Sequence, residues 1–279
     1  MTNTSATPET IFDLTGQVAI VTDASSGLGQ TFARTLAAAG ADLVVTSRDA
    51  ADCESLAEEL RQLEREVHCL QLDVTNQESI QTAVASAIES CGRIEILVNH
   101  ADGDAHKPAD EVSWEDWNQV VVAQAVANQM IEQRYGRIIN IGSMALLEAY
   151  KEFVPQGASR GGMTQMTIRL ANDWGPHGIS VNCLAPGWFQ TDQNNDLNDD
   201  PSWIEMLEQR IPLGRPGIAN DLQGALLLLA SQAARYITGQ TLHVDGGLSV
   251  SDMRATPVEQ NEEEDDDADA DEATDEIES

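Results

Sequence analysis

The sequence predicts an α/β fold in which helices cover both faces of a parallel sheet of about seven strands. Short apolar runs alternate with helical patterns along the chain, an order typical of parallel sheets that are buried on both sides. The length of 279 residues suits one large domain with an appendage. We therefore expect an N-terminal extension at 1–11, one α/β domain at 12–253 and an acidic tail at 254–279.

Each element is expected from its local pattern. Strands are expected at 17–22, 42–46, 68–72, 94–98, 137–141, 179–184 and 241–244. Helices are expected at 27–39, 50–66, 78–90, 157–174 and 221–230, and another runs from a capping-box-like start at Ser113 and Asp116 to about residue 133. Residues 188–214 interrupt the alternation, and we expect a mobile segment over the site there. The tail after Met253 has almost nothing to bury and is expected to be a disordered, solvating extension.

Net charge is the strongest compositional signal. The chain has 47 acidic and 15 basic residues, a net charge of −32, and only two lysines. Residues 255–279 hold 13 of the acids and no base, so removing that charge from −32 leaves −19 for the rest of the chain. An acidic surplus over the whole body indicates a halophilic protein, because the Debye length falls to about 3 Å in molar salt and self-repulsion is screened. The same charge disfavours nucleic acid and anionic membranes as partners.

The location is expected to be cytoplasmic. Residues 1–10 lack a basic and apolar leader, and no apolar run approaches the ~18 residues that span a bilayer. The four cysteines form no CxxC pair, which predicts buried free thiols in a reducing compartment.

A glycine-rich turn at 22–29 follows the first strand and opens a helix, the correct context for binding a pyrophosphate. The candidate cofactor residues in this turn are Thr22, Ser25, Gly27, Leu28 and Gly29. Asp23 stands where a tight turn would use glycine, and it brings a carboxylate to a site for an anion. Two like charges ~5 Å apart at an effective dielectric of ~20 repel by ~3 kcal/mol, so we expect roughly hundredfold weaker binding, which salt would soften.

Ser47 and Arg48 end the second strand, where an adenosine ribose would lie. An arginine there suits the 2′-phosphate of NADP, whereas a protein that prefers NAD usually carries an acid. The alternative is a solvated arginine in a loop. The cofactor, if any, is therefore NADP or NAD, with NADP favoured by Arg48.

These motifs, with an Asn-His-Ala-Asp stretch at 99–102, a Gln-x-x-x-Arg stretch at 156–160 and Pro186-Gly187, resemble the short-chain dehydrogenase/reductase family over residues ~12–250. The opening at 12–16 looks most like gluconate 5-dehydrogenase and 3-oxoacyl-carrier-protein reductase relatives. The resemblance implies a three-layer, Rossmann-type doubly wound sheet and NAD(P)-dependent hydride transfer between an alcohol and a ketone. It also implies further cofactor contacts, which fall at Asp73, Val74, Asn99, Ala101, Pro186 and Gly187.

The chain departs from the family at the residues that carry the reaction. The family's YxxxK reads Gln156 and Arg160, so the resemblance places a Gln where a Tyr exchanges a proton and an Arg where a Lys holds the nicotinamide ribose. Ser143 is in register with the family's substrate-holding Ser, although a capping role is the alternative. His100 and Asp102 replace Asn and Gly of the NNAG motif. A new acid/base pair of these two is disfavoured because neighbours at this spacing point to different sides of a strand end.

The helix before residue 134 is about nine residues shorter than in relatives. No residue securely replaces the Asn that anchors a proton-relay water there, although Gln124 stands near its place. This helix usually builds the family's dimer contact, so a homo-oligomer is expected but its usual helix interface is in question.

Three hypotheses follow. The first is a protein with the dehydrogenase fold and little or no activity, which would bind a nicotinamide nucleotide or a partner. The second is a working NAD(P)-dependent oxidoreductase with a rewired site that uses Tyr150 and Lys151, and a different reaction on the same fold is its variant. The third is an interaction protein that acts through its acidic tail.

Overall fold

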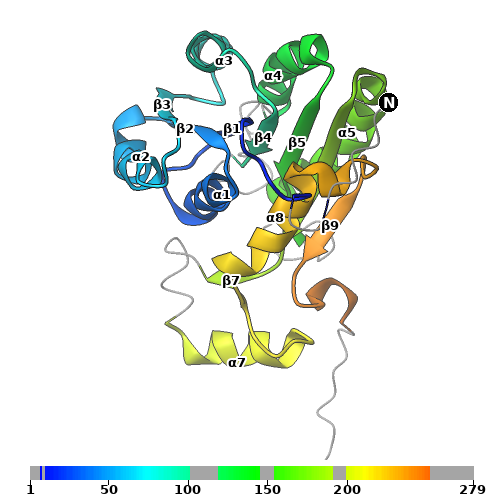
Figure 1. The fold of residues 1–279 in the computed structure, drawn as a ribbon. Coiled ribbons are helices and arrows are strands. Elements are labelled where there is room, and N and C mark those ends of the chain that lie inside the picture. The colour runs from blue at the N-terminus through cyan, green and yellow to red at the C-terminus, as the bar shows by residue number, and fades with distance from the viewer. Residues whose placement is uncertain (1–6, 8–9, 101–118, 145–153, 191–198, 252–279) are drawn as a thin grey trace, which may run out of the picture.

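The centre of the molecule is a seven-stranded parallel sheet in the order β3-β2-β1-β4-β5-β6-β9 (Figure 1). The computed structural model describes residues 7, 10–100, 119–144, 154–190 and 199–251, with the backbone alone at 119–120 and 154–158. The strands are β1 (Val18–Val21), β2 (Asp42–Ser47), β3 (Val67–Gln71), β4 (Ile96–Asn99), β5 (Gly136–Ile141), β6 (Ile179–Pro186) and β9 (Thr241–Val244). Every neighbouring pair is parallel. The predicted doubly wound α/β sheet is confirmed.

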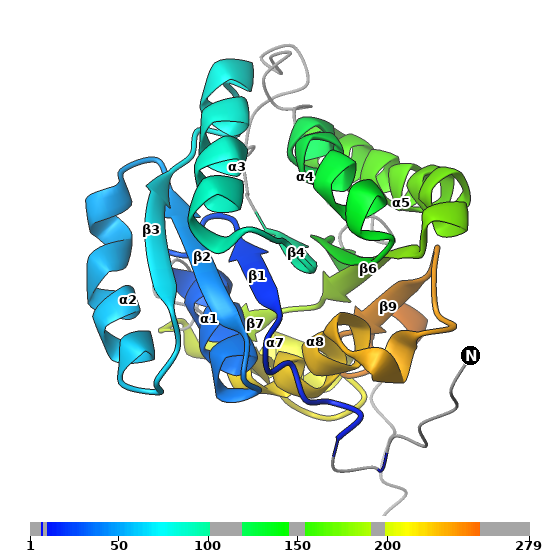
Figure 2. The same ribbon diagram turned by 45° about the horizontal axis from the view of Figure 1, so that its top comes forward.

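Helices cover the two faces of this sheet (Figure 2). One face packs against α1 (Gly27–Ala38), α2 (Glu54–Arg61) and α8 (Gln223–Ala230). The other packs against α3 (Gln77–Cys91), α4 (Gln119–Gln133) and α5 (Val154–Trp174). Short 3-10 turns join these elements: η1 (Ala50–Cys53), η5 (Gly175–His177), η7 (Ala219–Leu222), η8 (Gln232–Ala234) and η9 (Leu248–Val250). Because the chain crosses from β3 over β1 and β2 to β4, the strand order reverses between β1 and β4, where ligands bind in such sheets.

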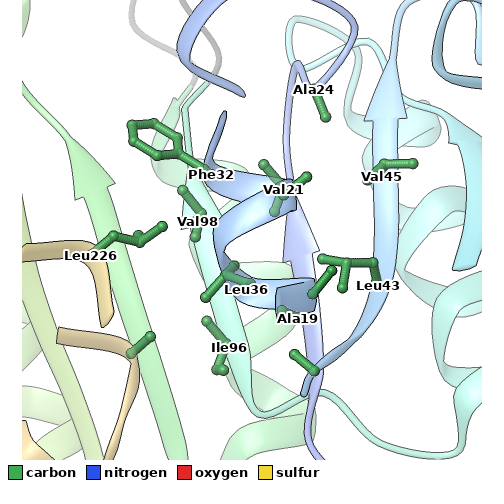
Figure 3. Packing of buried hydrophobic residues seen from close by; sticks show 14 of the residues in the cluster. Ala19, Val21, Ala24, Phe32, Leu36, Leu43, Val45, Ile96, Val98 and Leu226 are labelled. Carbon is green, nitrogen blue, oxygen red and sulfur yellow. The ribbon is translucent and has the colours of Figure 1, made fainter. Parts of the chain in front are cut away.

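The side chains of each strand alternate between two buried layers. Ala19 and Val21 of β1 face α1, where Phe32 and Leu36 are fully buried (Figure 3). Val18 and Ile20 point to the opposite layer, under α3 and α4. Each large aliphatic side chain buried in this way contributes roughly 1.5–3 kcal/mol of transfer free energy. The core therefore fixes the register of β1, and with it the position of the turn that follows.

The expected interruption at 188–214 contains regular structure. A short strand, β7 (Phe189–Gln190), pairs in parallel with β8 (Gly217–Ile218), and α7 (Pro201–Arg210) lies between them in the chain. Leu207 and Ile211 pack against Met144 and Leu248, which follow β5 and β9. The helix α7 is thus seated beyond the carboxyl ends of the strands, as Figure 1 shows.

Two predicted helices differ from the structure by three or more residues at one end. The helix expected at 50–66 is η1 followed by α2 and ends at Arg61, because Glu64 adopts a left-handed backbone (φ 59°). The helix expected to begin at Gly157 already begins at Val154. The predicted start of α4 near Ser113 lies outside the described residues.

Candidate functional site

The turn after β1 keeps the geometry of a glycine-rich turn although Asp23 replaces a glycine. Asp23 has φ 51° and Gly27 φ 54°, so both lie in the left-handed region. Asp and Asn enter this region more readily than other non-glycine residues. At Gly29 a Cβ would lie 2.2 Å from the Asp23 carbonyl oxygen, so only glycine allows the close approach of α1 to the turn. The amino end of α1, with no acid in its first turn, faces the end of β1 and provides a dipole that favours an anion.

His100 holds this turn from the neighbouring strand. Its backbone N–H donates to Thr22 Oγ1 at 2.9 Å, and its Nδ1 donates to the Asp23 carbonyl oxygen at 3.3 Å. The His100 ring also stands edge-on to Phe32 of α1, with ring centroids 5.5 Å apart. Two of the departures from the family motifs, Asp23 and His100, are therefore in direct contact. Sequence reasoning missed this contact because the two residues are 77 positions apart.

The end of β2 presents a cationic side chain beside the turn. Arg48 is exposed, and within the described part of the chain it forms no hydrogen bond or ion pair. Ser47 before it is buried and donates its hydroxyl to the Asp49 carbonyl oxygen. At the end of β3, hydrogen bonds from Thr75 hold the pKa of Asp73 below its ordinary value, and Arg48 nearby adds to this effect. The Arg48 guanidinium is thus available to an anionic ligand.

Arg160 of α5 is turned into the protein. It is 7% exposed, and its Nη1 donates to the carbonyl oxygen of Ile141, the last residue of β5, at 2.8 Å. Ser143 follows two residues later and is half-buried, so the structure brings these two predicted catalytic residues to the same strand end. Gln156 lies in the first turn of α5, one of the positions for which only the backbone is described.

Cys183 of β6 lies close to the Arg160 guanidinium. Burial raises the pKa of the Cys183 thiol to about 11, although the positive charge of Arg160 acts in the opposite direction. Both free cysteines at 53 and 183 are buried, and those at 69 and 91 are partly buried. The predicted free thiols are confirmed, and burial keeps Cys183 protonated near neutral pH.

Two amide side chains link the centre of the sheet to α5. Asn99 Nδ2 donates to Asn140 Oδ1 at 3.2 Å, and Asn140 Nδ2 donates to Thr167 Oγ1 at 3.0 Å. All three side chains are fully buried. This chain of hydrogen bonds ties β4 and β5 to α5 directly beneath the carboxyl ends of the strands.

The turn after β6 is closed by the loop that follows β9. Pro186 is buried at the end of β6, and a Cβ on Gly187 would lie 2.6 Å from the Asp245 Cβ. Asp245 accepts hydrogen bonds from the backbone N–H groups of Gly247 and Ser249, each at 2.9 Å. Burial raises the pKa of Asp245, but these hydrogen bonds outweigh burial and leave it below its ordinary value.

The predicted cofactor residues gather at one edge of the sheet. They lie in or directly after β1, β2, β3, β4 and β6, and they are Thr22, Ser25, Gly27, Leu28, Gly29, Ser47, Arg48, Asp73, Val74, Asn99, Pro186 and Gly187. Ala101, Asp102, Tyr150 and Lys151 lie outside the described residues. Gln124 is on the exposed face of α4, whereas Val122 and Val126 face the sheet, so its side chain points away from the sheet. Among the described residues no cluster of His, Cys, Asp or Glu would hold a metal ion, and no helix is long and apolar enough to span a membrane.

Comparison with known proteins agrees with this geometry. The sequence profile of a family described as enoyl-(acyl carrier protein) reductase matches residues 23–249. Gluconate 5-dehydrogenase of Gluconobacter oxydans (strain 621H) is 36% identical over 250 residues, which cover 86% of this chain and 98% of that protein. The chain belongs to the short-chain dehydrogenase/reductase family. A second relative, 3-oxoacyl-acyl-carrier-protein reductase of Escherichia coli (strain K12), is 34% identical over 84% of this chain and 97% of its own length.

A solved structure of the family supports the same fold. The gluconate 5-dehydrogenase of Burkholderia cenocepacia J2315, in complex with NADP and tartrate, has a TM-score of 0.81 and 36% identity over 87% of this chain and 98% of its own. The family consists of NAD(P)-dependent oxidoreductases. The fit of a dinucleotide to this chain depends on its own residues: the left-handed turn at Asp23, the close approach at Gly29 and the exposed Arg48 are all suited to one.

Proposed function

We propose that this protein binds a nicotinamide dinucleotide at the carboxyl ends of β1, β2 and β4 but carries out the family's hydride transfer far more slowly than its relatives, or not at all. The observation that carries this proposal is the Arg160 side chain, which is buried and bonded to the Ile141 carbonyl oxygen. It stands in the motif position of the Lys that in relatives holds the ribose and tunes the catalytic Tyr. That Tyr is itself replaced by Gln156.

The missing step is a proton transfer. A bound nicotinamide dinucleotide supplies or accepts the hydride, but the substrate oxygen must also gain or lose a proton. The amide of Gln156 has no proton to exchange near neutral pH, and Arg160 stands in place of the Lys that would assist a proton donor. General acid–base catalysis contributes typically 10²–10⁴-fold, which corresponds to about 3–5.5 kcal/mol of barrier. We therefore expect turnover to fall by at least this factor.

Dinucleotide binding is supported by the retained turn. The backbone of Asp23 takes up the conformation that the replaced glycine would have, and Gly27 and Gly29 keep their backbone roles. Arg48 is exposed and unpaired within the described residues, which favours NADP, because a guanidinium suits the 2′-phosphate. NAD remains the alternative cofactor.

A halophilic cytoplasm is the proposed setting. The 47 acidic residues outnumber the 15 basic ones so far that at least 32 carboxylates have no basic partner of their own. Exposed ion pairs such as Arg34–Glu59 and Arg215–Asp221 therefore neutralise only a small part of the surface. Molar salt would screen the remaining repulsion.

Calorimetric titration with NADPH and NADH in molar KCl tests the proposal. We expect saturable binding with a Kd near the micromolar range, about −8 kcal/mol. Arg48→Gln should weaken NADPH binding. Arg235→Gln should leave it unchanged, because it alters another exposed arginine whose side chain has no partner among the described residues. No heat with either nucleotide from a folded sample would overturn the proposed dinucleotide binding.

A further inference from the structure

We infer that Asp23 is a specificity-determining residue of the dinucleotide site, whose carboxylate opposes the 2′-phosphate that Arg48 attracts. The inference rests on the proposed dinucleotide binding and adds to it a second, opposing determinant of cofactor choice. It follows from the conformation of the turn, from its attachment to β2 and from the hydrogen bonds that Asp49 and Asp73 accept at this edge of the sheet.

The backbone of Asp23 is held in one orientation. Its carbonyl oxygen is fixed between the Cα of Gly29, where no side chain would fit, and Nδ1 of His100 at 3.3 Å. The carbonyl therefore points toward α1 and β4.

The turn is attached to the end of β2. The N–H of Ala24, the next residue, donates to the carbonyl oxygen of Thr46 at 2.8 Å, and Thr46 is followed directly by Ser47 and Arg48. The Asp23 carboxylate also acts electrostatically on the residues that follow β2. Burial raises the pKa of the Cys53 thiol in η1, and the Asp23 carboxylate is among the charges that raise it further. Asp23 thus acts on the region where the adenosine ribose of a dinucleotide lies.

The Asp23 carboxylate differs from those of Asp49 and Asp73 in its hydrogen bonding. Asp23 is half-buried, and its carboxylate has no hydrogen bond or ion pair within the described part of the chain. Asp49, the acid nearest the end of β2 in sequence, caps η1 by accepting from Ala51 N–H at 3.0 Å. Asp73, at the end of β3, accepts from both the backbone and the hydroxyl of Thr75. Of these three acids, Asp23 is the one whose carboxylate forms no hydrogen bond within the described residues.

The chemistry at the ribose makes the effect selective. A 2′-hydroxyl can donate a hydrogen bond to a carboxylate, whereas a 2′-phosphate is repelled by it. At a separation of ~5 Å and an effective dielectric of ~20, one pair of unit charges changes affinity by about a hundredfold. Arg48 acts with the opposite sign on the same phosphate, so in the native protein the two residues cancel part of each other's effect.

The test is a calorimetric comparison of NADPH and NADH on wild type, Asp23→Asn, Arg48→Gln and the double variant in 0.1 M KCl. Asn also tolerates the left-handed backbone, so Asp23→Asn removes the charge and keeps the turn. We expect it to tighten NADPH binding at least tenfold and to leave NADH binding unchanged or weaker, and Arg48→Gln should reduce this gain. Asp52→Asn, which removes an exposed acid from the adjoining η1, should change neither.

Other outcomes separate the inference from the proposed function. Equal tightening of NADH and NADPH would show that the carboxylate acts on the pyrophosphate common to both, and would overturn the inference alone. No change with either nucleotide would also overturn it, because the carboxylate would then face away from the ligand. If no folded variant binds either nucleotide, the inference and the proposed dinucleotide binding both fail.

Discussion

Gly29 offers the sharpest test of the turn because the structure predicts the clash that Gly29→Ala would create. The new Cβ would lie 2.2 Å from the Asp23 carbonyl oxygen and 3.0 Å from Ala24 Cα, whereas a C···O contact normally exceeds about 3.3 Å. The atoms it meets are backbone, so the turn must move by about 1 Å. Overpacking of this kind costs about 1–3 kcal/mol, and loss of the Ala24–Thr46 hydrogen bond adds about 1 kcal/mol.

We therefore expect Gly29→Ala to lower the free energy of unfolding by about 2–4 kcal/mol. For a domain of this size that is a fall in Tm of roughly 4–16 °C. Thermal unfolding followed by circular dichroism in molar KCl measures it. The control is Gly161→Ala in the interior of α5, where a Cβ would meet nothing within 4 Å and helix propensity should add about 0.5–1 kcal/mol of stability. Equal Tm values for Gly29→Ala and wild type would refute the close approach of α1 to the turn.

Four further predictions concern charge and burial. Because burial raises the pKa of Cys183 to about 11, this thiol should react with iodoacetamide at pH 8 far more slowly in native than in denatured protein, and fast native labelling would contradict its burial. The pKa of Asp245 is lowered in the folded state, so its contribution to stability is complete above the unfolded-state value of about 4 and is lost as the pH falls through the folded value. Asp245→Asn should therefore lower the urea midpoint at pH 7 but not at a pH below both values. Glu95 is 1% exposed, accepts from Val18 N–H at 2.8 Å and pairs with Arg93, so Glu95→Gln should lower the free energy of unfolding by about 1–3 kcal/mol; an unchanged urea midpoint would refute that role. Raising KCl from 0.1 to 2 M should raise Tm, because salt screens the repulsion between the acidic residues. The same rise is expected after deletion of 254–279. A rise confined to the full-length chain would assign the salt effect to the tail.

The sheet could be predicted from the sequence because both of its faces are buried. β1 reads as an unbroken apolar run, and in β5 and β6 the apolar residues are interspersed with Arg137, Asn140, Ser180 and Asn182. Every residue of these three strands is buried. The helix α1 was also predictable, since its apolar positions recur at the spacing of one face and glycines open it. Both patterns lie within short stretches of sequence, and burial of the same residues in the sheet and under α1 stabilises the structures that the patterns predict.

The candidate site was predictable in its location but not in its contacts. The contact of His100 with Asp23 joins two strands, so no local pattern contains it. The orientation of the Arg160 side chain also could not be predicted, because a long side chain can face either a ligand or the protein interior. The Ile141 carbonyl oxygen, which accepts its hydrogen bond, lies 19 residues earlier in the chain. The helix α7 was not predicted, because its apolar residues pack against residues distant in sequence, such as Met144 and Leu248, which follow β5 and β9.

Hydride transfer itself tests the central claim most directly. The measurement is NADPH oxidation with 5-keto-D-gluconate, the substrate for which one relative is named, in molar KCl, by wild type and by the Gln156→Tyr/Arg160→Lys variant. We expect wild type to bind the nucleotide and to turn over at least a hundredfold more slowly than the variant, which restores the proton donor and its lysine. Wild-type turnover in the ordinary range of 1–10³ s⁻¹, undiminished in Gln156→Ala, would contradict the loss of catalysis and show that another group transfers the proton.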